Sequence, residues 1–431
     1  MKSICVIGLG YIGLPTASML ASKGFSVCGV DINPEIVEII NKGDIHIEEP
    51  GLQSLVKTVV DSGALKAYTA PQASDVYIIA VPTPVRSDKK ASLDYVEAAA
   101  KSILNLLKPG NLVILESTSP PDTTKGFLVP ILEKSNLEIG EELFVAYCPE
   151  KVLPGRIITE LVENQRIVGG INEKSAQMAK EVYQSFVEGE IYLTDTVTAE
   201  MVKIMENTYR DVNIAFANEL AKISHKMGIN AWEVISLANL HPRVNIHTPG
   251  PGVGGHCISV DPWFIVEKNP ALALLINQGR HINDSMPEFT YNLITEQVKH
   301  IPNAKITVLG LTYKPDIDDI RESPAIEIAK MIESNPNLRL ASYDPHVKGS
   351  NHNLSSFEDA FKDSDCVVLA VNHCEFNSIK PSEIAKLVKN KIIIDTRNTL
   401  NQSEWEESGF KYVLLGNGHL VKTESKEYAQ A

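Results

Sequence analysis

A glycine-rich turn close to the N-terminus constrains the fold of this chain more than any other feature. The sequence GLGYIG occupies residues 8–13, directly after the apolar run Ser3–Ile7 and directly before the helix-length segment Leu14–Lys23. In the pattern GxGxxG the first glycine permits a tight turn, the second lets phosphate groups approach the backbone, and the third lets the helix pack against the strand. This setting predicts a Rossmann-like unit in which parallel strands alternate with helices.

The same alternation occurs at both ends of the chain. Short apolar runs typical of buried strands occupy Ser3–Ile7, Ser26–Val30, Val76–Val81 and Leu112–Leu115, and again Lys305–Leu311, Arg339–Tyr343, Cys366–Val371 and Lys391–Asp395. Longer amphipathic segments separate them, which is typical of βαβ units. Asp31 and Asp344 each follow the second run of their set. We therefore expect an α/β fold with two Rossmann-like, doubly wound parallel sheets of related plan.

A long helix is predicted between the two sheets. In Thr198–Met227 apolar residues recur at spacings of three and four, and Gly228 supplies a stop signal. We expect this helix to join the sheets and to carry an oligomer interface. The predicted domains are residues 1–195, 196–300 and 301–431, and the polar tail after Leu420 is expected to be loosely ordered.

An acidic residue indicates which dinucleotide the glycine turn prefers. Asp31 lies 18 residues after Gly13, where a carboxylate can accept hydrogen bonds from the ribose hydroxyls and repel a 2′-phosphate. This favours NAD over NADP, although a glycine turn that binds nothing stays an alternative. The C-terminal counterpart GLTYKP, residues 310–315, lacks the second and third glycines. Its Lys314 instead offers a cation to a phosphate or a hydroxylated ligand.

Composition excludes several classes of function. The chain has 54 acidic and 40 basic residues and a net charge of −14, which weighs against nucleic-acid and anionic-membrane binding. Six cysteines without a CxxC pair are too scattered for a disulfide framework or a zinc ribbon, and the histidines suggest no metal site. Neither a signal peptide nor a membrane-spanning run is expected. We predict a cytoplasmic protein.

One cysteine lies in a loop suited to catalysis. The sequence PGPGVGGHC, residues 249–257, ends at Cys257, and Asp261 with Pro262 is expected to form the N-cap and the first residue of a helix. A nearby helix N-terminus promotes the nucleophilic thiolate. We therefore predict that Cys257 is a nucleophile. His256 is expected to contact substrate or to pack within the loop, because neighbours in sequence usually point apart.

Several motifs in order resemble the UDP-glucose/GDP-mannose dehydrogenase family. They are GLGYIG with Asp31, VPTP at 81–84, EST at 116–118, PE at 149–150, EMVKIMEN at 200–207, the GGHC loop with Asp261, and GLTYKPDIDDIRESP at 310–324. The resemblance extends from the N-terminus to about Arg397. It implies an NAD-dependent enzyme that oxidises a nucleotide sugar at C6 to a uronate, a four-electron reaction.

Within this family the chain resembles the branch that acts on UDP-2-acetamido sugars. Pro154 stands where the UDP-glucose branch has a second glutamate, and HPRVNI at 241–246 and DPWFIV at 261–266 fit the 2-acetamido branch. The resemblance implies oxidation of UDP-N-acetyl-D-mannosamine through a Cys257 thiohemiacetal and thioester, within polysaccharide biosynthesis. UDP-N-acetyl-D-glucosamine is the alternative substrate. A two-electron hydroxyacid-type dehydrogenase, which needs no thiol, and a protein that only binds NAD or a nucleotide sugar are less favoured.

The resemblance also implies roles for individual residues. The catalytic set is Cys257, Lys203, Asn207, Asp261, Glu150 and Thr118. The cofactor set is Gly8, Gly10, Tyr11, Ile12, Gly13, Asp31, Thr83, Thr118 and Arg321. The substrate set is Arg243, His256, Lys314, Arg397, Lys203 and Asn207, with Arg243 acting in the neighbouring subunit of a homodimer. Lys203 and Asn207 are four residues apart, hence on one helix face; the division of proton transfers among Lys203, Asp261 and Glu150 stays open.

Overall fold

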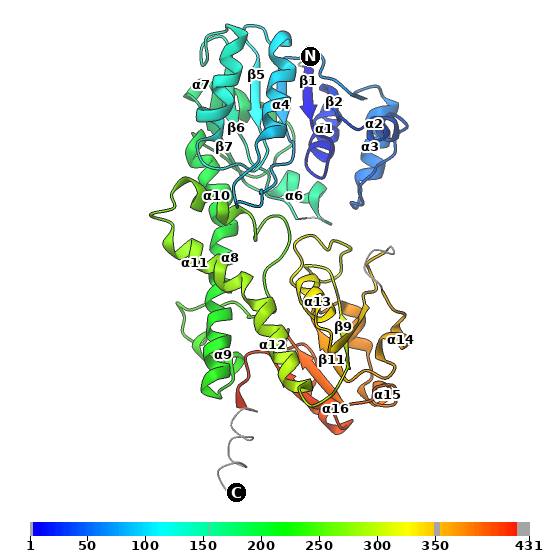
Figure 1. Cartoon of the computed structure of the whole chain (residues 1–431). Coiled ribbons are helices and arrows are strands. Elements are labelled where there is room, and N and C mark those ends of the chain that lie inside the picture. The colour runs from blue at the N-terminus through cyan, green and yellow to red at the C-terminus, as the bar shows by residue number, and fades with distance from the viewer. Residues whose placement is uncertain (1–2, 154, 349–353, 420–431) are drawn as a thin grey trace, which may run out of the picture. The chain divides into compact units, whose positions relative to one another are not determined.

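The computed structural model describes residues 3–153, 155–348 and 354–419. Pro154 and the polar tail after Leu420, for which the sequence made predictions, lie outside these residues. The chain divides into two compact units (Figure 1). Unit 1 comprises Met1–Glu206 and Trp263–Asn269, and unit 2 comprises Asn207–Pro262 and Pro270–Ala431. Within the described ranges, no helix has the length and apolar character that crossing a membrane requires.

Unit 1 contains an eight-stranded sheet in the order β3-β2-β1-β4-β5-β6-β7-β8. Its strands are β1 (Ser3–Ile7), β2 (Ser26–Val30), β3 (Leu65–Tyr68), β4 (Val76–Ile79), β5 (Leu112–Leu115), β6 (Phe144–Tyr147), β7 (Arg166–Gly170) and β8 (Ile191–Asp195). Its helices are α1 (Gly13–Ser22), α2 (Pro34–Asn41), α3 (Leu52–Asp61), α4 (Asp94–Ile103), α5 (Val129–Leu132), α6 (Ile157–Glu163) and α7 (Glu173–Tyr183), with short helical turns η1 (Leu104–Leu106), η2 (Thr124–Leu128) and η3 (Glu133–Ser135).

The central strands of this sheet are buried on both faces. In β1, Ile4 and Val6 belong to one apolar cluster, whereas Cys5 and Ile7 belong to another. Successive side chains of a strand point to opposite faces, so both faces of the sheet are covered. This is the doubly wound arrangement that the sequence predicted.

One junction of the sheet departs from the predicted parallel arrangement. β6 pairs with β7 in the antiparallel direction, whereas the other strand pairs of this sheet are parallel. Burial explains why the sequence does not reveal this reversal. β7 is almost fully buried, as β6 is, and a short buried run has the same apolar pattern in either direction.

Unit 2 contains a parallel five-stranded sheet in the order β10-β9-β11-β12-β13. Its strands are β9 (Ala304–Leu309), β10 (Leu338–Tyr343), β11 (Cys366–Leu369), β12 (Ile392–Asp395) and β13 (Lys411–Leu414). Its helices are α9 (Ala231–Ala238), α11 (Leu274–Asp284), α12 (Met286–Val298), α13 (Pro324–Ser334), α14 (Phe357–Phe361), α15 (Pro381–Ile384) and α16 (Gln402–Glu407), with the turn η5 (Cys374–Ser378). The fold is therefore α/β with two Rossmann-like sheets.

The long helix α8 (Thr196–Met227) has 32 residues and contributes to both units. At 1.5 Å per residue it extends about 48 Å. Asp195 caps its start by accepting hydrogen bonds from the amide (2.9 Å) and the hydroxyl (2.6 Å) of Thr198. It ends before Gly228, whose φ of 70° suits a C-terminal glycine. α10 (Asp261–Lys268) likewise contributes to both units.

The apolar side chains of α8 fall into two groups, one buried and one exposed. Ile204, Thr208 and Ala215 are buried. Other large apolar side chains of the helix are 42–61% exposed, namely Met205, Tyr209, Phe216, Ile223 and Met227. The helix therefore presents apolar surface that unit 1 and unit 2 do not bury.

Candidate active site

The glycine turn lies at the carboxyl edge of the unit 1 sheet. A side chain at Gly8, whose φ is 94°, would place its Cβ 2.5 Å from the Ala80 carbonyl oxygen, and one at Gly13 would lie 1.8 Å from the Gly8 carbonyl oxygen. A Cβ at Gly10 would meet nothing within 4 Å. The two outer glycines are thus required by packing, and Gly10 leaves room for a ligand to approach the backbone. The strand order reverses between β1 and β4, where open α/β sheets bind dinucleotides.

Asp31 is held beside this turn at the end of β2. Its Oδ2 accepts a hydrogen bond from the Leu9 amide (3.2 Å), and its Oδ1 accepts one from the Asn33 amide (2.9 Å). A carboxylate has about four acceptor positions. The side chain is therefore oriented by the backbone and keeps capacity for two ribose hydroxyls.

The other predicted cofactor residues of unit 1 lie at the same edge. Tyr11 and Ile12 belong to the turn itself, with Tyr11 45% exposed. Thr83 follows β4 and Thr118 follows β5, and the Thr83 hydroxyl donates to the Thr118 carbonyl oxygen (2.5 Å). Carboxyl ends of parallel strands meet at one sheet edge, so the structure brings these residues together.

Glu150, which follows β6, is buried in an ion pair that the sequence analysis missed. Its Oε2 accepts a hydrogen bond from Arg166 Nη2 (2.6 Å), and its Oε1 accepts one from the Lys151 amide (2.7 Å). The Arg166 guanidinium lies 4.7 Å from the centre of the Tyr183 ring. The sequence does contain a signal for this ion pair, because an arginine begins the otherwise apolar strand RIVGG.

A second carboxyl group, Glu116, shares this buried cluster. Its Oε1 lies 3.9 Å from Arg166 Nη1 and accepts a hydrogen bond from the Tyr183 hydroxyl (3.1 Å). Burial, together with the charge of Glu150, raises the pKa of Glu116 to about 8. Glu116 therefore carries a proton at neutral pH, and Arg166 balances the charge of Glu150.

In unit 2, Cys257 is exposed at the end of a loop that packs tightly against another loop. Added side chains at Gly252, Gly254 and Gly255 would place a Cβ within 3 Å of Pro324, the Glu322 carbonyl oxygen and the Tyr313 ring, respectively. The Gly255 amide also donates to the Arg321 carbonyl oxygen (3.2 Å). We call residues 250–257 and 313–324 the interlocked loops. Their packing explains why the cysteine loop is rich in glycine.

The helix after this loop begins one residue earlier than predicted. Asp261 and Pro262 are the first two residues of α10, so the expectation that Asp261 is the N-cap is wrong. The Asp261 carboxylate instead accepts a hydrogen bond from Asn207 Nδ2 (2.7 Å), and the Asp261 amide donates to the Cys257 carbonyl oxygen (2.8 Å). Asn207, Asp261 and Cys257 are thereby linked. Lys203 is half-buried on α8, one turn before Asn207 and on the same helix face.

Two predicted substrate cations lie at the carboxyl edge of the unit 2 sheet. Lys314 is exposed in the loop after β9, and the Thr312 hydroxyl donates to its carbonyl oxygen (2.8 Å). Arg397 follows β12, and its Nε donates to the Ala370 carbonyl oxygen (3.1 Å). Burial lowers the pKa of Arg397 to about 10, which leaves the guanidinium charged at neutral pH. Its Nη1 would lie 2.7 Å from a Cβ at Gly250, so Arg397 reaches the cysteine loop.

The remaining predicted residues have different surroundings. Arg321 pairs with Asp319 (2.7 Å), whose carboxylate also lies 4.0 Å from His256 Nδ1. Burial and the nearby Arg321 charge lower the pKa of His256. Arg243 is exposed, and in the described part of the chain no hydrogen bond or ion pair joins it to another predicted substrate residue. The structure thus links His256 and Arg321 through Asp319 but leaves Arg243 apart.

In the second sheet, as in the first, a carboxylate after the second strand accepts a hydrogen bond from a backbone amide after the first strand, but its surroundings differ. The Leu311 amide donates to Asp344 Oδ2 (2.6 Å), as Leu9 does to Asp31. Asp344, however, is buried and also contacts His373 Nε2 (3.1 Å). Although burial opposes it, hydrogen bonds from His373 and backbone amides lower the pKa of Asp344 to about 2. Because its oxygens are engaged, Asp344 is poorly placed to hold a second ribose.

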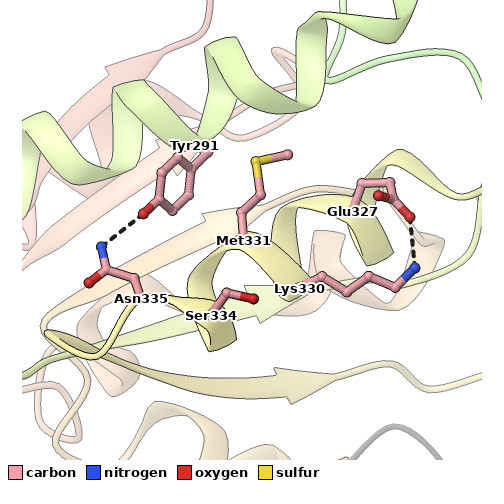
Figure 2. A pocket seen from close by; sticks show the side chains of 6 residues that line it. All are labelled: Tyr291, Glu327, Lys330, Met331, Ser334 and Asn335. Carbon is pink, nitrogen blue, oxygen red and sulfur yellow. Dashed lines mark hydrogen bonds and ion pairs between the residues drawn. The ribbon is translucent and has the colours of Figure 1, made fainter.

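A surface hollow of about 420 Å³ lies elsewhere in unit 2, between α12 and α13 (Figure 2). The Asn335 amide donates to the Tyr291 hydroxyl (2.8 Å) on one side, and Lys330 pairs with Glu327 (2.8 Å) on the other. The hollow is lined by Tyr291, Glu327, Lys330, Met331, Ser334 and Asn335. None of these is a predicted site residue, so the hollow is not the candidate active site.

Comparison with known proteins gives a consistent result across the chain. Profiles of the UDP-glucose/GDP-mannose dehydrogenase family match residues 2–187 (NAD binding domain), 197–285 (central domain) and 307–402 (UDP binding domain). UDP-N-acetyl-D-mannosamine dehydrogenase of Methanococcus vannielii is 52% identical, over 97% of this chain and 98% of its own length. NDP-N-acetyl-D-galactosaminuronic acid dehydrogenase of Ralstonia solanacearum is 46% identical, over 92% of this chain and 96% of its own length.

Solved structures give the same picture. The UDP-D-ManNAc dehydrogenase structure from Pyrococcus horikoshii has a TM-score of 0.89 at 44% identity, covering 97% of this chain and 100% of that one. The UDP-N-acetyl-mannosamine dehydrogenase structure from Staphylococcus aureus has a TM-score of 0.90 at 47% identity, with the same coverage.

Proposed function

Because the chain belongs to the UDP-glucose/GDP-mannose dehydrogenase family, it is an NAD-dependent nucleotide-sugar dehydrogenase, and we propose that it oxidises UDP-N-acetyl-D-mannosamine at C6 to the uronate. The observation that carries the proposal is the pair of interlocked loops: one ends at Cys257, the proposed nucleophile, and the other contains Lys314, the proposed phosphate ligand. The names of relatives at about half identity over nearly the whole chain support the mannosamine substrate.

The thiol accounts for oxidation beyond the aldehyde. NAD, when bound, accepts one hydride in each of the two oxidation steps. In the first step the C6 alcohol loses a proton and a hydride and becomes an aldehyde. The Cys257 thiolate then adds to the aldehyde carbon and forms a thiohemiacetal. Loss of the second hydride leaves a thioester, and water cleaves it to the carboxylate and the thiol.

The groups around the thiol suit the proton transfers of this sequence. Asn207 is held by Asp261 at 2.7 Å, so its amide is fixed for donation to a developing oxyanion. Lys203, one helical turn away, is proposed to take up or stabilise the alkoxide, and Asp261 to act with it as general base. Glu150, held by Arg166, and Thr118 are proposed to border the nicotinamide and the hydrolytic water.

Binding is divided between the two sheets in this proposal. NAD is held by the glycine turn, by Asp31 and by the threonines at the same sheet edge, and Arg321 is also assigned to the cofactor. The open space over Gly10 fits the pyrophosphate. The UDP diphosphate is held by Lys314 and Arg397, and His256 contacts the substrate. We retain residues 1–195, 196–300 and 301–431 as the NAD, central and UDP parts.

We also propose that the enzyme is a homodimer, with Arg243 reaching the active site of the neighbouring subunit. The exposed apolar residues of α8 (Met205, Tyr209, Phe216, Ile223 and Met227) support an interface on this helix. We also propose a cytoplasmic location, because six scattered cysteines without a CxxC pair are too few for the disulfide framework of a secreted protein.

The first prediction concerns stoichiometry. With excess NAD and limiting UDP-N-acetyl-D-mannosamine, two molecules of NADH are expected per molecule of sugar consumed, because the thiol retains the aldehyde for the second oxidation. Absorbance at the NADH band and the product mass measure this ratio. One NADH per sugar would contradict the role of Cys257. Turnover of UDP-N-acetyl-D-glucosamine alone would shift the proposal to that epimer.

A second prediction concerns cofactor choice. Asp31→Asn is expected to weaken NAD binding about tenfold, because charged hydrogen bonds to the ribose become neutral ones. The ratio of kcat/KM for NADP to that for NAD should rise, since repulsion of the 2′-phosphate is lost. The matched control is Asp44→Asn, at an exposed carboxylate of the same unit. Equal NAD affinities for both variants would show that Asp31 does not contact the ribose.

A further inference from the structure

Four side chains that can ligate metals meet at the carboxyl edge of the unit 2 sheet, and the proposed function uses none of them. Asp316 lies in the loop after β9, His346 follows β10, and His373 and Glu375 follow β11. One oxygen or nitrogen atom of each residue lies within 4.8 Å of those of the other three. We propose that these residues bind a divalent transition-metal ion, with Zn²⁺ the best match to two imidazoles and two carboxylates.

The spacing of the ligand atoms suits tetrahedral coordination. Bonds of about 2.0–2.2 Å place the ligand atoms of a tetrahedral Zn²⁺ about 3.3–3.6 Å apart. His346 Nε2 lies 3.2 Å from Glu375 Oε1, and His373 Nδ1 lies 3.8 Å from Asp316 Oδ1. Each pair is therefore already close to the required separation. To complete the site the Asp316 amide must also leave His373 Nδ1, so the loop that carries Asp316 moves along with the side chains.

His373 is oriented as a metal-ligating histidine usually is. Its ring is fully buried, and its Nε2 contacts the buried carboxylate of Asp344 (3.1 Å). Its Nδ1 accepts a hydrogen bond from the Asp316 amide (2.9 Å), which puts the ring proton on Nε2 and a lone pair on Nδ1. A carboxylate behind a histidine in this way fixes its tautomer and raises its basicity toward a metal. On binding, Nδ1 exchanges the amide of Asp316 for the ion.

The charge of the cluster calls for a cation. In the described residues, the salt bridges of Asp316 and Glu375 are made only to His373 and His346, respectively, with no lysine or arginine partner. Two carboxylates beside two imidazoles offer four ligand atoms, and a divalent ion would balance the charge of the carboxylates.

The sequence does not reveal this metal site, because its ligands come from three distant segments and have no recognised spacing. The topology explains how they meet, since β10, β9 and β11 are neighbours and their carboxyl ends share one edge. Asp316 is two residues from Lys314. A bound ion therefore ties together three loops, one of which carries a proposed substrate cation.

The test is a Zn²⁺ titration of the untagged, chelator-treated full chain by calorimetry, with the visible spectrum of Co²⁺ as a second readout. Saturable binding of about one ion per chain and a tetrahedral Co²⁺ spectrum are expected. His346→Ala and Glu375→Gln, both at accessible side chains, should each weaken binding at least about tenfold. His300→Ala, at an exposed histidine outside the cluster, is the matched control and should bind as the parent does.

Two results would overturn the proposal. One is the absence of saturable binding, or binding that both cluster variants retain. The other is binding that Cys257→Ser abolishes while the cluster variants keep it, because the ion would then belong to the thiol. Retained binding in Cys257→Ser supports the cluster. None of these readouts depends on turnover, so they stand apart from the proposed dehydrogenase activity.

Discussion

Replacing Cys257 by serine is expected to lower kcat for uronate formation by at least about a thousandfold, the scale on which loss of a covalent nucleophile acts. A cysteine thiol is in general a few per cent thiolate at neutral pH and is intrinsically very nucleophilic, whereas a serine hydroxyl is not ionised. Binding of NAD and of the UDP-sugar should persist, because serine differs from cysteine by one atom. Steady-state kinetics and calorimetry measure the two effects separately.

The matched control for this variant is Cys374→Ser, which changes the other exposed cysteine of unit 2. Its kcat should stay within about twofold of the parent value. If Cys257→Ser still forms two NADH per sugar at the parent rate, the covalent mechanism is wrong. If both variants lose kcat to the same extent, the loss reflects a general effect of replacing exposed thiols and not the loss of a nucleophile.

Replacing Arg166 by methionine is expected to lower the free energy of unfolding by about 3–5 kcal/mol, the cost of leaving a buried charge without its partner. Arg166 is 3% exposed and is the cation that lies 2.6 Å from the buried Glu150 carboxylate. Glu116, with its raised pKa, is already protonated at neutral pH and offers no compensation. Chemical denaturation of the full chain, followed by circular dichroism, measures the change.

Arg156→Met is the matched control, because it removes an exposed arginine whose partner Glu160 lies 3.9 Å away on the same helix. Such exposed pairs contribute about 0–1 kcal/mol. Adding Glu150→Gln to Arg166→Met should recover part of the stability, since it removes the unpaired charge. If Arg166→Met and Arg156→Met are equally stable, the buried pair does not stabilise unit 1.

The features that sequence predicted correctly are local or periodic. β1, β2 and β5 have the predicted boundaries because each is a short apolar run bounded by polar or turn-forming residues. The glycine turn and Asp31 were recognisable because a fixed spacing expresses a fixed geometry. Asp344 was correctly placed after the second strand of the second sheet, because the order of apolar runs repeats that of the first sheet.

The features that sequence missed depend on tertiary contacts. The direction of β7 is set by its pairing with β6, and apolar content carries no information about direction. The pair of Glu150 and Arg166 joins the segment after one strand to the start of the next. The start of α10 was misjudged because Asp261 bonds to the distant Asn207 instead of capping its own helix.

The interlocked loops also constrain how this protein can change over generations. Three glycines of one loop lie against Tyr313, Glu322 and Pro324 of the other, so a substitution on either side is tolerated only with an accommodating one opposite. A variant that takes one of the two loops from a distant relative is expected to need the other loop from the same relative. In an alignment of descendants, residues of the two loops should covary.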